Sequence, residues 1–217
     1  MTARTTAGDG LVPGSDGRMR CFWCAGDPVY EGYHDREWGR PAYEDRALFE
    51  KLCLETFQAG LSWRLILARR AALRRAFAGF EPFALARFAE SDIARLLADP
   101  AIVRHRGKIE AVIANARAVC GLIEREGSLS AFVWRFAPDP ARHRRPNSRA
   151  EFVARTESPE SRALARALRE RGFRFLGPVT IYAFMQAMGL VNDHVLGCPA
   201  GEVRAAAGAG SPVEGSG

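Results

Sequence analysis

Histidines and cysteines near the two ends of the sequence could together bind one metal ion. The stretch NDHVLGC holds His194 and Cys198, and RCFWCAGDPVYEGYHDREWG holds Cys21, Cys24 and His34. If NDHVLGC is helical, its histidine and cysteine lie on one face and can bind the same ion. One N-terminal cysteine and His34 would complete a Cys2His2 tetrahedron, a ligand set typical of structural zinc. The alternative is that all of these are ordinary buried residues.

A carboxylate lies on the buried face of an expected helix. In YEDRALFEKLCLETFQAGLSW, the residues Leu48, Leu52, Glu55 and Ala59 have the spacing of one helical stripe. An ionised group there is costly unless it has a partner, so Glu55 either pairs with a buried arginine or points into a ligand cavity.

Aromatic residues favour a cavity for this carboxylate over a purely structural pair. Rings that could line a pocket around one acidic hydrogen-bond acceptor are those of Trp23, Tyr30, Tyr33, Trp38 and Trp63. The alternative for each ring is ordinary core packing.

A basic cluster marks the junction between two expected helices in SDIARLLADPAIVRHRGKIEAVIANARAV. The first helix ends before Pro100 and the second opens near Gly107, with Arg104, His105, Arg106 and Lys108 at the junction. The arrangement is similar to a helix-hairpin-helix, in which a helix N-terminus and basic side chains hold a DNA phosphate without reading sequence. The alternative is a solvated corner between two helices.

The elements that must position these residues are expected to be helices throughout. Leu, Ala, Arg and Glu dominate, and no β-branched run alternates with a period of two. The helix that begins at Pro178 is apolar nearly all round and is expected to be central and buried. The expected helices cover residues 44–58, 63–77, 92–98, 107–125, 159–171 and 178–190.

Composition limits the organisation and the class of partner. We expect one folded unit over residues 19–203, a disordered tail over 1–18 and a flexible tail over 204–217. The sequence has no apolar run that could serve as a secretory signal or membrane span, and its five cysteines are an odd number, so we expect a cytoplasmic protein without disulfides. The net charge of +6 is compatible with an anionic partner.

Taken together, the motifs identify the chain as similar to a known family. RCFWC, DPVYEGYHDREWG, LETFQAGLSW, IVRHRGKIEAVIANA, FVWRF and RGFRFLGPVTIYAFMQAMGLVNDHVLGC occur in this order and resemble the bacterial 3-methyladenine DNA glycosylase I family. The resemblance covers nearly everything from Arg20 to Cys198. Cys24 departs from the family pattern and leaves the choice between Cys21 and Cys24 open. Residues 138–158 match poorly and are expected to form a variable loop.

The resemblance implies an all-α helix-hairpin-helix glycosylase fold in which a zinc site joins the N- and C-terminal segments. Carried over by position, Glu55 is the catalytic carboxylate of the pocket, and Leu61 enters the DNA duplex. The basic residues expected to contact DNA at the helix-hairpin-helix are Arg104, Arg106 and Lys108. The pocket walls are Trp23, Tyr30, Tyr33 and Trp63. The ligands of a structural Zn²⁺ are Cys21, His34, His194 and Cys198.

The resemblance also implies the reaction. We expect a monomeric, monofunctional enzyme that acts on double-stranded alkylated DNA near the bacterial nucleoid. It would flip out 3-methyladenine and hydrolyse the N-glycosidic bond, leaving an abasic site. Two alternatives are a non-enzymatic DNA-binding module stabilised by zinc and a hydrolase with catalytic zinc, although four protein ligands leave zinc no open position for catalysis.

Overall fold

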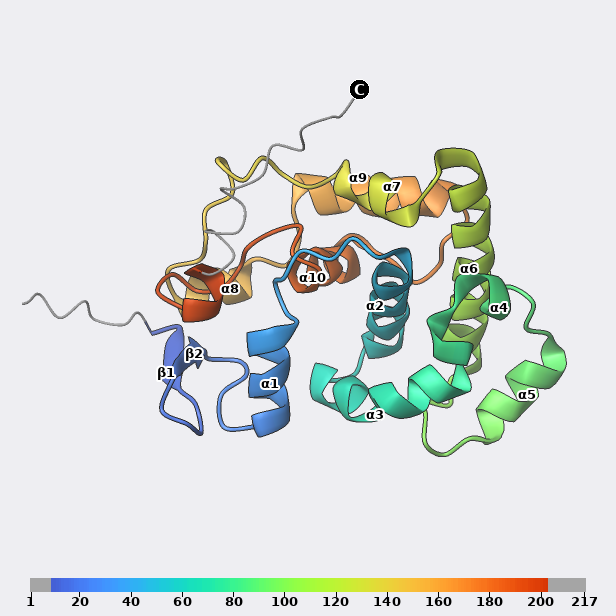
Figure 1. Cartoon of the computed structure of the whole chain (residues 1–217), viewed down its shortest axis with the longest axis horizontal. Coiled ribbons are helices and arrows are strands. Elements are labelled where there is room, and N and C mark those ends of the chain that lie inside the picture. Colours follow the sequence, from blue (N-terminus) through green and yellow to red (C-terminus); the bar gives the residue numbers. More distant parts are fainter. Residues whose placement is uncertain (1–8, 203–217) are drawn as a thin grey trace, which may run out of the picture. The chain divides into compact units, whose positions relative to one another are not determined.

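The structure, a computed structural model, describes residues 9–202 and is mainly helical, with one small antiparallel sheet (Figure 1). Contacts between residues divide the chain into two compact units, where the sequence predicted one. Unit 1 consists of Met1–Pro41, Pro138–Arg155 and Gln186–Gly217, and unit 2 consists of Ala42–Ala137 and Thr156–Met185. Each unit is described by itself.

Unit 1 contains a short sheet that corrects two sequence expectations. Strand β1 (Leu11–Pro13) pairs antiparallel with β2 (Met19–Cys21), with Leu11 opposite Cys21. Leu11 packs against the buried cluster of Cys21, Val195 and Cys198, so an apolar side chain in the expected tail has a place in the core. The prediction of an all-α fold is therefore wrong at this sheet, and the predicted disordered tail is wrong for residues 9–18. Residues 1–8 and the expected tail over 204–217 lie outside the described residues.

Unit 1 also contains two helices that the sequence analysis did not anticipate. Helix α1 (Pro28–Arg36) begins at Asp27, whose carboxylate accepts from the backbone N–H groups of Val29 and Tyr30. Proline at the first helical position reinforces this start. Helix α8 (Arg149–Ala154) lies in the segment expected to be a variable loop and begins at Ser148, which caps it through its hydroxyl.

Unit 2 contains the helices that the sequence predicted, with bounds within two or three residues. Its elements are α2 (Asp45–Gln58), α3 (Trp63–Ala76), η1 (Ala78–Phe80), α4 (Pro82–Leu85), α5 (Glu90–Ala98), α6 (Arg106–Glu126), α7 (Leu129–Trp134), α9 (Pro159–Glu170) and α10 (Pro178–Ala187), whose last two residues belong to unit 1. Helix α2 packs on α3, α6 and α7. Residues 48–57 of α2 are all buried, which makes it a central helix of this unit.

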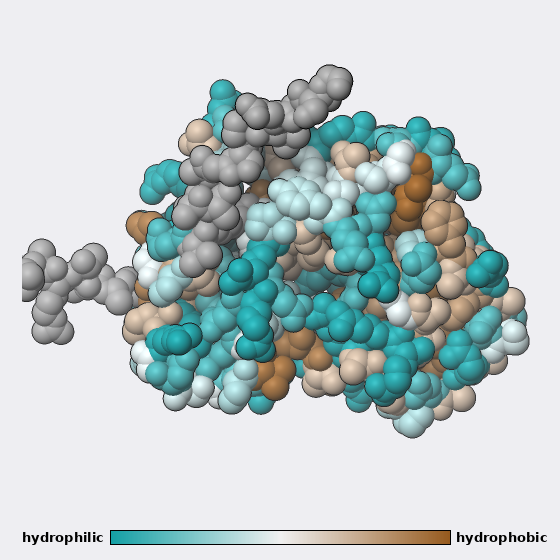
Figure 2. All heavy atoms as spheres, in the orientation of Figure 1, coloured by the Kyte–Doolittle hydropathy of each residue, from teal (hydrophilic) through white to brown (hydrophobic). Residues whose placement is uncertain are grey.

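The surface carries no large continuous apolar area on the face drawn in Figure 2, where hydrophilic residues surround separate apolar spots. Within residues 9–202, no helix combines the length and the apolar character needed to cross a lipid bilayer.

Candidate functional site

Four buried side chains in unit 1 form a group with the geometry of a metal site. The ligand atoms of Cys21, His34, His194 and Cys198 all lie within 4.8 Å of one another. Cys198 Sγ is 3.5 Å from His34 Nε2 and 3.7 Å from His194 Nδ1, and Cys21 Sγ is 3.8 Å from His194 Nδ1. A tetrahedron with zinc–ligand bonds of about 2.0–2.3 Å has edges of about 3.3–3.8 Å. The four side chains therefore fit a tetrahedral ion, and they are the four that the resemblance implied.

Both histidines are oriented by their second ring nitrogen. His34 Nδ1 is 2.8 Å from Asp35 Oδ1, and His194 Nε2 is 3.2 Å from the carbonyl oxygen of Trp38. These partners leave Nε2 of His34 and Nδ1 of His194 directed at the group, an arrangement common around bound metals. Burial lowers the pKa of His194, which favours the neutral imidazole that binds metal.

The two cysteines of the group lie close enough to shift each other's pKa. The hydrogen bond between the thiols lowers the pKa of Cys198 and raises the pKa of Cys21. One member of the pair is thus readily ionised, as a thiolate ligand must be.

The C-terminal pair converges without a helix over residues 192–198. Residues 192–198 form turns, and Val195 N donates to Cys21 Sγ at 3.3 Å. Arg145 fixes this segment by donating to the carbonyl oxygens of His194, Val195 and Cys198 at 3.0, 2.9 and 3.3 Å. The sequence analysis missed Arg145 because the surrounding segment looked like a variable loop.

Glycine is required beside this group. Gly39 has φ +76°, and a Cβ added there would lie 2.7 Å from His194 Nε2. A larger residue would both strain the backbone and displace the histidine.

Cys24 is buried but stands outside the group. Its thiol donates to the carbonyl oxygen of Cys21 at 3.2 Å, and burial raises its pKa to about 12. The geometry therefore selects Cys21 from the two N-terminal cysteines.

Aromatic rings of unit 1 pack directly against the two histidines of the group. The ring centroid of Trp23 is 5.6 Å from that of Tyr30, 6.5 Å from Tyr33 and 5.3 Å from His34. Trp38 lies 4.7 Å from His194. The Nε1 atom of Trp23 is buried without a hydrogen-bond partner in the described part of the chain. The aromatic rings and the two histidines therefore form one packed cluster.

Glu55 and Trp63 lie together in unit 2 with a residue that the sequence analysis overlooked. Glu55 is 3% exposed, and its Oε1 is 2.8 Å from Nζ of Lys51, one helical turn earlier in α2. Oε2 of Glu55 has no hydrogen-bond partner among residues 9–202. Lys51 Nζ lies 3.4 Å from the ring centroid of Trp63, the first residue of α3. The partner of Glu55 is therefore a lysine of its own helix, where a buried arginine was one expectation.

The segment between α2 and α3 carries Leu61, which is 37% exposed. Lys108 supports it from α6, where its ammonium donates to the carbonyl oxygens of Phe57 and Ala59 at 2.8 and 2.5 Å. Lys108 is buried, and burial lowers its pKa. The expectation of a DNA-facing Lys108 is therefore wrong, because its charge is used to bind carbonyl groups at the end of α2.

The junction between α5 and α6 retains two exposed arginines. Arg106 pairs with Glu90 and Glu110 at 2.9 and 3.2 Å, whereas Arg104 is exposed and has no ion pair among residues 9–202. Arg69 of α3 braces the connection by donating to the carbonyl oxygen of Ile102 at 2.9 Å.

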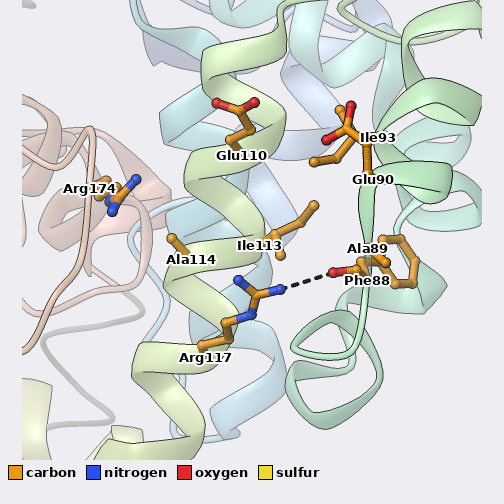
Figure 3. A pocket seen from close by; sticks show the side chains of 9 residues that line it. All are labelled: Phe88, Ala89, Glu90, Ile93, Glu110, Ile113, Ala114, Arg117 and Arg174. Atoms are coloured by element: carbon orange, nitrogen blue, oxygen red, sulfur yellow. Dashed lines mark hydrogen bonds between the residues drawn. The ribbon is translucent and has the colours of Figure 1, made fainter.

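A hollow of about 260 Å³ lies between α5 and α6 in unit 2 and does not include Glu55. Figure 3 shows that Arg117 crosses it and donates to the carbonyl oxygen of Phe88, at 3.0 Å. Its lining mixes two carboxylates with two guanidinium groups, from Glu90, Glu110, Arg117 and Arg174.

Comparisons with known proteins agree on one family. The model of the family described as "Methyladenine glycosylase" matches residues 23–201. DNA-3-methyladenine glycosylase 1 of Escherichia coli (strain K12) is 45% identical over 179 residues, which are 82% of this chain and 95% of that protein.

Solved structures give the same result. A crystal structure of 3-methyladenine DNA glycosylase I is 46% identical, with a TM-score of 0.78 over 83% of this chain and 98% of the other. A variant of 3-methyladenine DNA glycosylase I in complex with 3-methyladenine is 37% identical, with a TM-score of 0.79 over 83% of this chain and 96% of the other. With the family model, the sequence identity and the shared fold in agreement, the chain belongs to the methyladenine glycosylase family.

Proposed function

We propose that the chain excises 3-methyladenine from alkylated double-stranded DNA and leaves an abasic site. The observation that carries the proposal is Glu55, a buried carboxylate beside Trp63 whose Oε2 lacks a hydrogen-bond partner in the described part of the chain. A buried polar atom left in this way is costly unless a ligand uses it. The activity named for the relatives supports the same reaction. The test is release of the free base from methylated duplex DNA.

The chemistry needs recognition more than acid catalysis. Methylation at N3 gives the adenine a positive charge, which makes the base a good leaving group. When the bond between C1′ and N9 breaks, its electron pair stays with the base and neutralises it. Water then bonds to C1′ and loses a proton to solvent. The remaining task is to extrude the nucleotide, at a cost of a few kcal/mol, and to reject ordinary adenine.

The proposed recognition combines an acceptor with aromatic faces. Oε2 of Glu55 can accept from the amino group of the base, while Trp63 can stack on it and attract its positive charge. On the resemblance alone, Trp23, Tyr30 and Tyr33 of unit 1 are also proposed as stacking residues. This arrangement argues against a mere DNA-binding module, which would gain nothing from an open buried carboxylate.

The metal is proposed to be a structural Zn²⁺ held by Cys21, His34, His194 and Cys198. Four protein ligands fill a tetrahedron, so zinc would supply cross-linking of the polypeptide and no step of the reaction. This assignment argues against the alternative of a hydrolase with catalytic zinc.

Zinc content provides a prediction for this site. We expect about one zinc ion per chain in untagged protein, measured by elemental analysis, because a Cys2His2 group completes the tetrahedron. Cys24→Ser is expected to retain the metal, since the Cys24 thiol donates to the backbone carbonyl oxygen of Cys21 and is not one of the four ligand side chains. Loss of zinc in that variant would show that the wrong cysteine has been assigned.

The proposed DNA contacts are a helix-hairpin-helix formed by α5 and α6, together with Leu61 as a residue that enters the duplex. The N-terminus of α6 offers backbone N–H groups to a phosphate. Arg104 is proposed as the main basic contact, because Arg106 would first have to leave its two carboxylates. We further propose that the chain acts as a monomer.

The salt dependence of duplex binding tests the hairpin. Arg104→Ala is expected to lower the slope of log affinity against log salt by about one unit, because one phosphate contact is lost. Arg125, an exposed arginine in the last turn of α6, provides the control and is expected to leave the slope unchanged on substitution by alanine. Equal slopes for wild type and Arg104→Ala would remove the residue from the interface.

We propose that the enzyme is monofunctional. A lyase would need a lysine with access to the sugar carbon, and the residue nearest the hairpin, Lys108, is buried with its ammonium bound to two carbonyl oxygens. The positively charged base also leaves without covalent activation.

A further inference from the structure

Lys51 is a buried charge that the reaction described above does not use. It is 6% exposed, although lysine is rarely found buried. Its ammonium contacts the two residues of unit 2 that are proposed to bind the base, at 2.8 Å from Glu55 Oε1 and 3.4 Å from the ring centroid of Trp63.

We propose that Lys51 is a positioning residue for base recognition, which holds Glu55 ionised with one oxygen open and reserves one face of Trp63. The inference rests on the proposed function and assigns a third member to its recognition site.

The contact with Glu55 accounts for the state of the carboxylate. The ammonium occupies Oε1, whereas Oε2 remains without a partner among residues 9–202. A buried carboxylate without a nearby cation tends to bind a proton or to rotate toward water. Lys51 therefore keeps the acceptor charged and fixed before the base arrives, at the cost of burying a second charge.

The contact with Trp63 restricts the faces of the indole ring on which a base can stack. At 3.4 Å from the ring centroid, the ammonium covers one face of the indole. A flipped base therefore cannot stack on this face. The same ammonium thus fixes the orientation of the Glu55 carboxylate and excludes the base from one face of Trp63. Neither effect requires Lys51 to touch the base.

Other buried charged residues of unit 2 have partners of their own and do not replace Lys51. Glu50 pairs with Arg70 and Arg74 of α3 at 2.7 and 2.9 Å. Lys108 of α6 binds the carbonyl oxygens at the end of α2.

The test is a double-mutant cycle of single-turnover base release from methylated duplex DNA. Lys51→Met is expected to slow release about 10- to 100-fold, the effect of losing a charge-assisted hydrogen bond at the acceptor, with unchanged affinity for undamaged duplex. In a Glu55→Gln background, Lys51→Met is expected to add less than about 3-fold, because Lys51 acts through Glu55. Lys51→Arg, which keeps the charge, is expected to recover part of the rate.

Arg74→Met is the matched control, because it removes the ion pair between Arg74 of α3 and Glu50 of α2 and leaves Glu55 unchanged. It is expected to keep the wild-type rate of base release. Lys51→Gln provides a second neutral variant should Lys51→Met fail to fold, as judged by circular dichroism.

Two results would overturn the role of Lys51. One is wild-type release by a folded neutral variant, and the other is an equal loss in the wild-type and Glu55→Gln backgrounds, which would indicate a purely structural effect. Absence of base release by the wild-type protein would instead refute the proposed function, so the two failures are distinguishable.

Discussion

Glu55→Gln is expected to lower the rate of base release from methylated duplex DNA by about 100-fold or more, the size typical of losing one preorganised charged contact. The amide keeps the shape of the side chain but removes the negative charge that faces the cationic base. It also ends the ion pair with Lys51, which is 2.8 Å from Oε1 in the wild-type chain. The measurement is single-turnover release of labelled base at saturating protein.

Glu50→Gln is the matched control for this change. Glu50 is also a buried glutamate of α2, but it binds Arg70 and Arg74 of α3. We expect Glu50→Gln to lower stability and to retain base release, and we expect Glu55→Gln to retain affinity for undamaged duplex. Full excision by Glu55→Gln would remove the carboxylate from the mechanism.

His194→Ala is expected to lower the melting temperature by about 10 °C or more, because losing a structural metal costs about 4 kcal/mol or more in a chain of this size. His194 lies within 3.7–3.8 Å of both cysteines of the metal group and packs against Trp38. Thermal unfolding and elemental analysis on the same sample measure the melting temperature and the zinc content.

Cys24→Ser serves as the control for this experiment, since Cys24 is equally buried but lies outside the metal group. Its melting temperature is expected to stay within a few degrees of the wild-type value. A zinc-free His194→Ala protein with an unchanged melting temperature would contradict a structural role for the metal.

Much of unit 2 was predictable from the sequence because its helices are long and their apolar residues follow the helical period. The burial of Glu55 also followed from that period, since it lies on the same stripe as Leu48 and Leu52. Its partner was visible in principle, because Lys51 precedes Glu55 by four residues and lies on the same face of α2.

Features that depend on contacts distant in sequence could not be predicted in the same way. Leu11 became a strand residue because it packs against the cluster of Cys21 and Cys198, which no local pattern reveals. Lys108 looked exposed because its neighbours are basic, and only the approach of α6 to the end of α2 explains its burial. Helix α1 is a different case, because Asp27 and Pro28 form a recognisable helix start that the sequence analysis did not use.

The metal group shows both limits and strengths of sequence reasoning. The ligand set followed from residue types and from the resemblance, and the structure places all four side chains together. Residues 192–198 are not helical, and Arg145 and the turn at Val195 bring His194 and Cys198 together.

The measurement that tests the central claim most directly is product analysis after wild-type, zinc-containing protein acts on methylated duplex DNA. Free base is separated by chromatography, and the strand is examined before and after treatment with alkali. We predict that 3-methyladenine is released and that the strand stays intact until alkali cleaves the abasic site. No released base, or a strand cut without alkali, would contradict a monofunctional glycosylase.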